Sequence, residues 1–315
     1  MPRLLPADVH TDRYLTNVGL AWMNDADNYI ASKIAPVIKV TNESDKYPTW
    51  TKADFFRNEA KKIAAGDPAP RGGFTVSSDT YSCDEVAIAN VLPARLIRNA
   101  DSAYKVQTMA TRWTTDQLLL KREIDAATEI FSATNYTNTA AVGTQWSNAA
   151  ATPVSDMLAA MDLVEDQTGG LRANTIVMGA EVWRELVDHS QVLTFVYGPG
   201  ADRAMPITPK LLENYFSNVV GTPVRIFVGR GVYNTSAENA TASYSKIWGK
   251  NCWIAHVTTT PAAMVPSAAY TFQANYEVRK WYEQHTKNTV VEARELRDIK
   301  PVSADCAYYY TSAVA

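Results

Sequence analysis

The stretch that decides the architecture is residues 106–131, VQTMATRWTTDQLLLKREIDAATEIF. Its apolar residues recur at the three- and four-residue spacing of one helix face. They are Val106, Met109, Trp113, Leu120, Ile124, Ala127 and Phe131, with Lys121, Arg122, Glu123 and Asp125 on the opposite side. With Asp101 or Ser102 as the N-cap, the pattern predicts a helix over 102–134, roughly 45–50 Å long. Such a helix packs along a sheet and needs no chemistry of its own.

The sequence after this helix alternates between helical and strand patterns. Thr152-Pro153 starts a helix that Gly169-Gly170 ends, and Thr208-Pro209 starts another. Strands are expected at 174–179, 224–228 and 246–257, so residues 174–260 predict a compact α/β unit. From residue 270 onward the strand patterns carry one charged face, which is typical of an antiparallel sheet that is solvated on one side.

The sequence before the helix is too polar, and too often interrupted by Pro and Gly, to form a core of its own. Residues 1–40 predict an arm, and 41–82 an extended hairpin around the cluster Gly66-Asp67-Pro68-Ala69-Pro70-Arg71-Gly72-Gly73. Aromatic and basic side chains on this hairpin are our candidate contacts with a neighbouring subunit, because aromatic residues are enriched at protein interfaces and charged residues can fix the register between subunits. They are Trp50, Phe55, Phe56, Arg57, Lys61 and Lys62. The alternative is a solvated hairpin without a partner.

Composition excludes several classes of protein. The 315 residues carry 30 Lys+Arg and 33 Asp+Glu, a net charge of −3, which argues against a protein that wraps nucleic acid electrostatically. There is no run of about 18 apolar residues and no apolar signal-peptide core, so we expect no membrane partner and no secretion. Cys83, Cys252 and Cys306 are far apart and predict buried thiols in a reducing compartment.

The sequence holds no recognisable catalytic motif. GxxxxGK[ST], GxSxG and HExxH are all absent, and the four histidines are too scattered for a metal cluster. We therefore assign no catalytic residue, metal ligand or cofactor, and we expect a protein that is not an enzyme.

Short blocks in a fixed order carry a family resemblance. Among them are Asn28-Tyr29-Ile30-Ala31-Ser32-Lys33-Ile34-Ala35-Pro36-Val37, Phe55-Phe56-Arg57, Met178-Gly179 and Ile247-Trp248-Gly249-Lys250. With the long helix between them, the chain resembles the major capsid proteins of tailed bacteriophages, which have the Hong Kong 97-type capsid fold.

The resemblance implies an α+β fold in five segments. These are an N-terminal arm (1–40), an E-loop hairpin (41–82), a peripheral domain (83–173) whose spine helix is 102–134, an axial domain (174–260), and a C-terminal return to the peripheral domain (261–315). It also implies a structural protein that self-assembles as hexamers and pentamers into an icosahedral head in the virion.

The expected partners are many copies of the same chain, a separate scaffolding protein and a portal. Double-stranded DNA would be packaged inside without sequence-specific binding, after assembly in the host bacterial cytoplasm. Two alternatives stay open. One is an encapsulin-like compartment shell, and the other is an α/β enzyme with titratable groups in a concave pocket.

Overall fold

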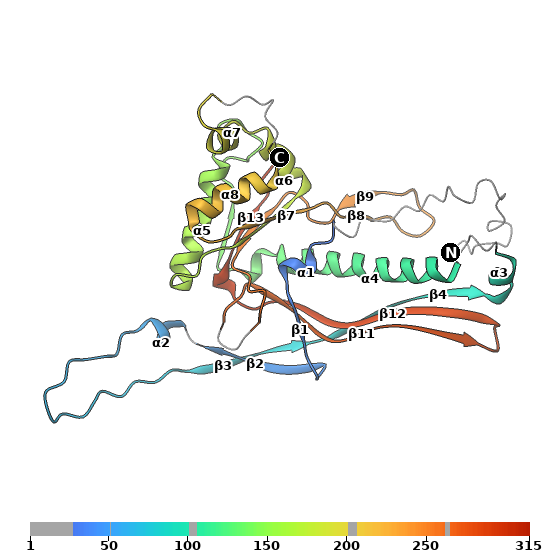
Figure 1. Cartoon of the computed structure of the whole chain (residues 1–315), viewed down its shortest axis with the longest axis horizontal. Helices are drawn as coiled ribbons and strands as arrows, with labels where there is room; N and C mark the ends of the chain where they lie inside the picture. The colour runs from blue at the N-terminus through green and yellow to red at the C-terminus, as the bar shows by residue number, and fades with distance from the viewer. Residues whose placement is uncertain (1–27, 51, 101–105, 201–206, 262–264) are drawn as a thin grey trace.

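The computed structural model describes residues 28–50, 52–100, 106–200, 207–261 and 265–315. A four-stranded sheet lies along the long axis of the molecule beneath helix α4 (Val106–Ile130) (Figure 1). Its order is β1-β11-β12-β4, with bounds Val37–Lys39, Ala269–Glu283, Asn288–Pro301 and Asp84–Pro93. β11 and β12 form a long antiparallel hairpin, β4 pairs antiparallel to β12, and β1 runs parallel to β11. The short helix α3 (Ala94–Asn99) follows β4.

Helix α4 confirms the predicted long helix, but its buried face differs from the predicted one. The buried residues are Ala110, Thr114, Leu118, Glu123, Ala126, Ala127 and Ile130. Of the seven apolar residues assigned inward, only Ala127 is buried; Met109 is 47% exposed and the others are half-buried. Four of these seven buried residues are small, Ala110, Thr114, Ala126 and Ala127, and small side chains let a helix approach its neighbours closely. The predicted N-caps, Asp101 and Ser102, lie outside the described residues.

A five-stranded sheet stands above one end of α4 (Figure 1). Its order is β5-β13-β10-β6-β7, with bounds Asn138–Ala141, Ala307–Thr311, Cys252–Ala255, Thr175–Gly179 and Arg225–Gly229. Its helices are α5 (Pro153–Thr168), α6 (Ala180–Val187), α7 (Ser190–Tyr197) and α8 (Pro209–Val220). Ile176, Met157 and Phe216 are fully buried in the core between them. The predicted ends of α5 are confirmed, because it begins at Pro153 and Gly169 caps it with a φ of 72°.

Two elements pack outside the segment to which the sequence assigned them. The segment boundaries themselves remain predictions. Helix α5 packs on the five-stranded sheet, and β13 is a strand of that sheet. The strand expected over 246–257 is two strands, β9 (Tyr244–Lys246) and β10, with Trp248 in the turn between them. β9 pairs with β8 (Val232–Asn234) in a small separate hairpin. β4 was not predicted at all.

The N-terminal part of the described chain forms a small helix and a projecting hairpin. Helix α1 (Ala31–Ile34) lies beside α4. Strands β2 (Ser44–Trp50) and β3 (Val76–Ser82) pair antiparallel, with α2 (Lys52–Phe56) after β2. The chain between α2 and β3 extends away from the rest of the molecule (Figure 1). Two 3₁₀ turns, Ala133–Asn135 and Ala304–Cys306, complete the described elements. No helix in the described ranges combines the length with the apolarity that a bilayer crossing requires.

Candidate assembly interface

The outer part of the hairpin buries none of its side chains in this chain. Every residue from 55 to 78 is exposed. Phe55, Phe56 and Phe74 are 48%, 58% and 62% exposed, and the Phe55 and Phe74 rings face each other across the hairpin with centroids 5.6 Å apart. The backbone N–H of Thr75 donates to Asp54 Oδ2 at 2.9 Å, which also holds the two sides together. Aromatic side chains left in solvent on a projecting segment are typical of an interaction surface.

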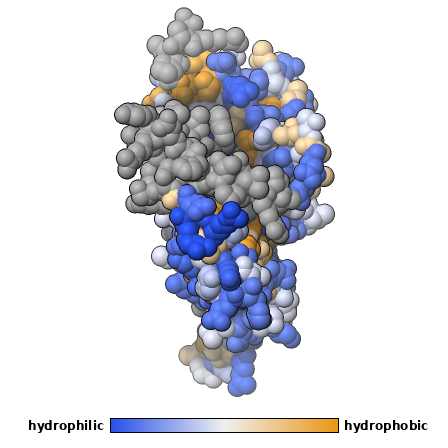
Figure 2. All heavy atoms as spheres, turned by 90° about the vertical axis from the view of Figure 1, so that its right-hand side faces the viewer, coloured by the Kyte–Doolittle hydropathy of each residue, from blue (hydrophilic) through white to orange (hydrophobic). Residues whose placement is uncertain are grey.

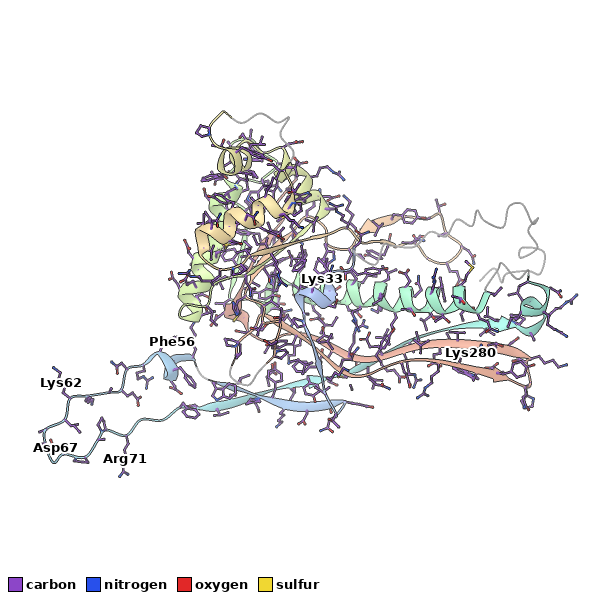
Figure 3. The ribbon with its side chains drawn as sticks, viewed as in Figure 1. Lys33, Phe56, Lys62, Asp67, Arg71 and Lys280 are labelled. Carbon is purple, nitrogen blue, oxygen red and sulfur yellow. The ribbon has the colours of Figure 1, made fainter. Side chains whose placement is uncertain are left out.

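The exposed hairpin also carries an excess of positive charge. Residues 57–75 contain four basic and two acidic side chains. Arg57 lies 3.6 Å from Glu59, between Nη1 and Oε1, whereas Lys61 and Lys62 have no ion-pair partner among the described residues. Figure 3 shows Lys62, Asp67 and Arg71 at the far end of the hairpin, remote from the rest of the chain. Charges placed in this way can orient the hairpin against a partner.

The root of the hairpin is fixed to the four-stranded sheet. The Tyr81 ring stacks on Phe272 with centroids 4.6 Å apart, and Tyr47 contacts the same ring at 5.5 Å. Tyr47 Oη donates to Asp79 Oδ2 at 2.7 Å, and Lys300 Nζ lies 2.9 Å from the same oxygen. The Tyr47 hydroxyl and then Lys300 lower the pKa of Asp79 to about 2. The hairpin is therefore anchored at its root, while its tip projects without packing against the rest of the chain.

The structure brings the six predicted contact residues onto one element. Phe55, Phe56, Arg57, Lys61 and Lys62 are exposed, and Trp50 is half-buried where it pairs with Val76 at the end of β2. The Phe56 ring also contacts Gly169, the C-cap of α5. Figure 3 labels Phe56 where α2 leads into the projecting part of the hairpin.

Sequence reasoning missed three exposed apolar residues on the same element, Ile63, Phe74 and Val76. The signal for Phe74 was its place directly after Gly72-Gly73, opposite Phe55 in a hairpin.

The rest of the described surface offers little that resembles a catalytic site. One hollow of about 730 Å³ is open and lined by residues 141–145, 147, 148 and 312, none of which is ionisable. In the described part of the chain, no group of three or more His, Cys, Asp or Glu side chains is arranged to hold a metal ion. The end of the molecule opposite the hairpin presents a mainly hydrophilic described surface (Figure 2).

Comparisons with known proteins agree with this geometry. No family model matches the chain. It is 24% identical over 242 residues to a major capsid protein of Pseudomonas phage JBD67, covering 76% of this chain and 74% of that protein. It is 22% identical over 255 residues to the major capsid protein of Burkholderia phage BcepMu, covering 78% and 76%.

Three solved structures share the arrangement of elements. A phage-related protein from Bordetella bronchiseptica RB50 matches with a TM-score of 0.69, 19% identity and coverage of 92% and 93%. The capsid of cyanophage P-SCSP1u matches at 0.64, with 11% identity and coverage of 96% and 93%. A virus-like particle from Pyrococcus furiosus matches at 0.54, with 11% identity and coverage of 89% and 91%.

These findings confirm the predicted class of protein. The chain has the α+β Hong Kong 97-type capsid fold, the fold of a shell subunit. Within that class it is similar to the major capsid proteins of phages, and the resemblance expected from the sequence is confirmed.

Proposed function

We propose that this chain is a phage major capsid protein, a structural protein without enzymatic activity that assembles from many copies into an icosahedral head. The observation that carries the proposal is the hairpin, which has an anchored root and exposed aromatic and basic side chains. A segment that buries no apolar surface in its own chain gains stability when a second copy covers it. The two phage relatives named as major capsid proteins support the same role.

The finer parts of the proposal rest on the resemblance to phage major capsid proteins. Copies associate as hexamers and pentamers, and each hairpin lies on a neighbouring copy through Phe55, Phe56, Arg57, Lys61 and Lys62, with Trp50 at its root. The head encloses double-stranded DNA, and the near-neutral net charge of −3 suits a container that does not grip its contents. A separate scaffolding protein and a portal complete the particle. The location is the virion, after assembly in the host bacterial cytoplasm.

Shortening the hairpin tests this role directly. Trp50 and Val76 already pair at the ends of β2 and β3, so an Asn-Gly turn can replace residues 51–75 and close the hairpin. We expect the shortened chain to keep its circular dichroism and thermal unfolding midpoint, because the removed stretch contributes almost no buried surface. Sedimentation velocity and negative-stain microscopy should then show no closed shells. Normal particles from the shortened chain would contradict the proposal.

A compartment shell is the second candidate, because the virus-like particle from Pyrococcus furiosus shares the fold. Both curated relatives at 22–24% identity are phage major capsid proteins, which favours the capsid. The contents of particles purified from the native source separate the two, since a head holds nuclease-protected DNA and a compartment holds a cargo protein.

A further inference from the structure

The buried carboxylate of Glu123 joins three parts of the chain that are distant in sequence. From the middle of α4, its Oε1 accepts hydrogen bonds from the backbone N–H of Ile30 at 2.9 Å and from the indole Nε1–H of Trp248 at 2.6 Å. Its Oε2 accepts from the backbone N–H of Ala31 at 2.9 Å and, more weakly, from that of Ile30 at 3.1 Å. The donors come from the start of α1 and from the turn between β9 and β10.

This carboxylate is held by N–H donors instead of by an ion pair. Glu123 is fully buried, and no Lys or Arg of the described residues lies within ion-pair distance of it. The two cations that directly precede it on α4 are engaged elsewhere, Lys121 with Asp125 and Arg122 with Glu295. Lys33 on α1 is exposed and acts only through space. On the strand before Trp248, Lys246 pairs with Glu181.

The stability of the buried Glu123 carboxylate therefore depends on each of its N–H donors. Burial raises the pKa of Glu123, while the N–H groups of Ile30, Ala31 and Trp248 act in the opposite direction. A buried charge that loses one of its few donors becomes more costly to keep, because no water replaces the lost bond.

Apolar packing surrounds the same point. Ile30, Ile34, Ala126, Ile130 and Trp248 belong to one buried cluster, which also contains Trp253. Figure 3 shows Lys33 on the short helix that lies against α4. The N-terminal segment 28–35 and the turn 247–251 thus pack on the same stretch of α4 and share a single acceptor.

We propose that Glu123 is a positioning residue that couples segment 28–35 to turn 247–251, so that loosening either one loosens the other. The two segments share the oxygens of one carboxylate. A change that removes the Trp248 donor therefore weakens the hold on Ile30 and Ala31, and the coupling is reciprocal. The coupling is a property of the single chain and does not rest on the proposed function.

Hydrogen–deuterium exchange of the full-length chain tests the coupling. Trp248→Phe removes the indole N–H and keeps an aromatic ring, and we expect the amides of 28–35 to exchange roughly tenfold faster, the effect of losing one bond to a charged group. Glu123→Gln brings an N–H₂ group against N–H donors, and should accelerate exchange in both 28–35 and 247–251.

Two matched variants separate coupling from general damage. Trp253→Phe removes an indole from the same cluster without touching a Glu123 hydrogen bond, and Glu129→Gln removes an exposed charge from the same helix. Both should leave exchange in 28–35 unchanged. The proposal is overturned if Trp248→Phe leaves segment 28–35 as protected as in the wild type, or if Trp253→Phe accelerates its exchange equally. If Glu123→Gln does not fold, the comparison of the two tryptophan variants still decides.

Discussion

Small side chains determine how α4 lies on its sheet. Ala110 lies in one buried cluster with Leu92 of β4 and Val291 of β12, and Ala126 lies in another with Ile299 of β12. Larger residues at these two positions would hold the helix away from the sheet. Beside them, Arg297 on β12 pairs with Asp125 on α4 at 2.5 Å and with Glu295 at 2.9 Å, so this buried guanidinium is charge-paired. Close packing and paired charges together fix the helix along the sheet.

We expect Ala126→Leu to destabilise the chain by roughly 1–3 kcal/mol, because Ala126 is fully buried and the added atoms overpack its site. Met109→Ala, on the exposed flank of the same helix, should change stability by less than about 0.5 kcal/mol. Chemical denaturation of both variants measures the difference. If Met109→Ala were the more damaging substitution, the assignment of the buried face would be wrong.

The pKa of Asp79 predicts how the hairpin root responds to acid. Its lowered value, about 2, means that the carboxylate stabilises the folded root at pH values above its unfolded pKa near 3.9. That stability is lost as the pH falls from about 4 toward 2, when Tyr47 and Lys300 lose their charged partner. The effect should stay below about 1 kcal/mol because Asp79 is about half exposed.

Hydrogen exchange in peptides 44–50 and 76–82, followed from pH 5 to pH 2, measures this loss. In Asp79→Asn the same peptides should begin less protected and change less with pH. An identical pH profile in the two proteins would show that Asp79 does not control the root.

Glu123 illustrates which residues a sequence pattern misplaces. It follows Lys121 and Arg122, so periodicity assigned it to the polar side of the helix, yet it is buried. Its burial depends on donors 92 to 125 residues away in the chain, and no local pattern contains them. The hairpin residues were predictable because Pro, Gly and charge exclude them from a core by composition alone.

Among the elements, the ones with local end signals were predicted best. Helix α5 has Pro in its first turn and a left-handed glycine at its end, and both signals lie in the sequence itself. Strand β4 has no such signal: Asp84, Glu85 and Asn90 disfavour strands, and its conformation comes from pairing with β12. The turn that carries Trp248 resembles a strand in sequence for the converse reason, since the apolar Ile247 and Trp248 stand close before the apolar residues of β10.

The C-cap of α5, Gly169, also contacts the Phe56 ring on α2. Gly169→Ala should destabilise the chain by about 1–2 kcal/mol, because φ is 72° and an added Cβ overlaps the Phe56 ring. Gly143→Ala, with open space around it and no positive φ, is the matched control and should be near neutral. Thermal unfolding compares them. Combining Gly169→Ala with Phe56→Ala should recover the part of the lost stability that is due to the overlap. If no stability is recovered, the overlap with Phe56 does not contribute to the effect of Gly169→Ala.

At the scale of the whole molecule, the chain divides into a well-packed body and a reaching hairpin. Two sheets, each with its own covering helices, share a buried boundary that contains Trp248, Trp253 and Ile130. The outer hairpin leaves Phe55, Phe56 and Phe74 in solvent. This division agrees with the proposed role, in which the hairpin is covered by a neighbouring copy.

The measurement that tests this account most directly is electron microscopy of the purified full-length chain, together with sedimentation velocity at increasing concentration. The account predicts closed shells of uniform size, in which the hairpin of each copy lies on its neighbour and Phe55 and Phe74 are covered. A chain that stays a single monomeric species at high concentration, with those phenylalanines still exposed to solvent, would contradict it.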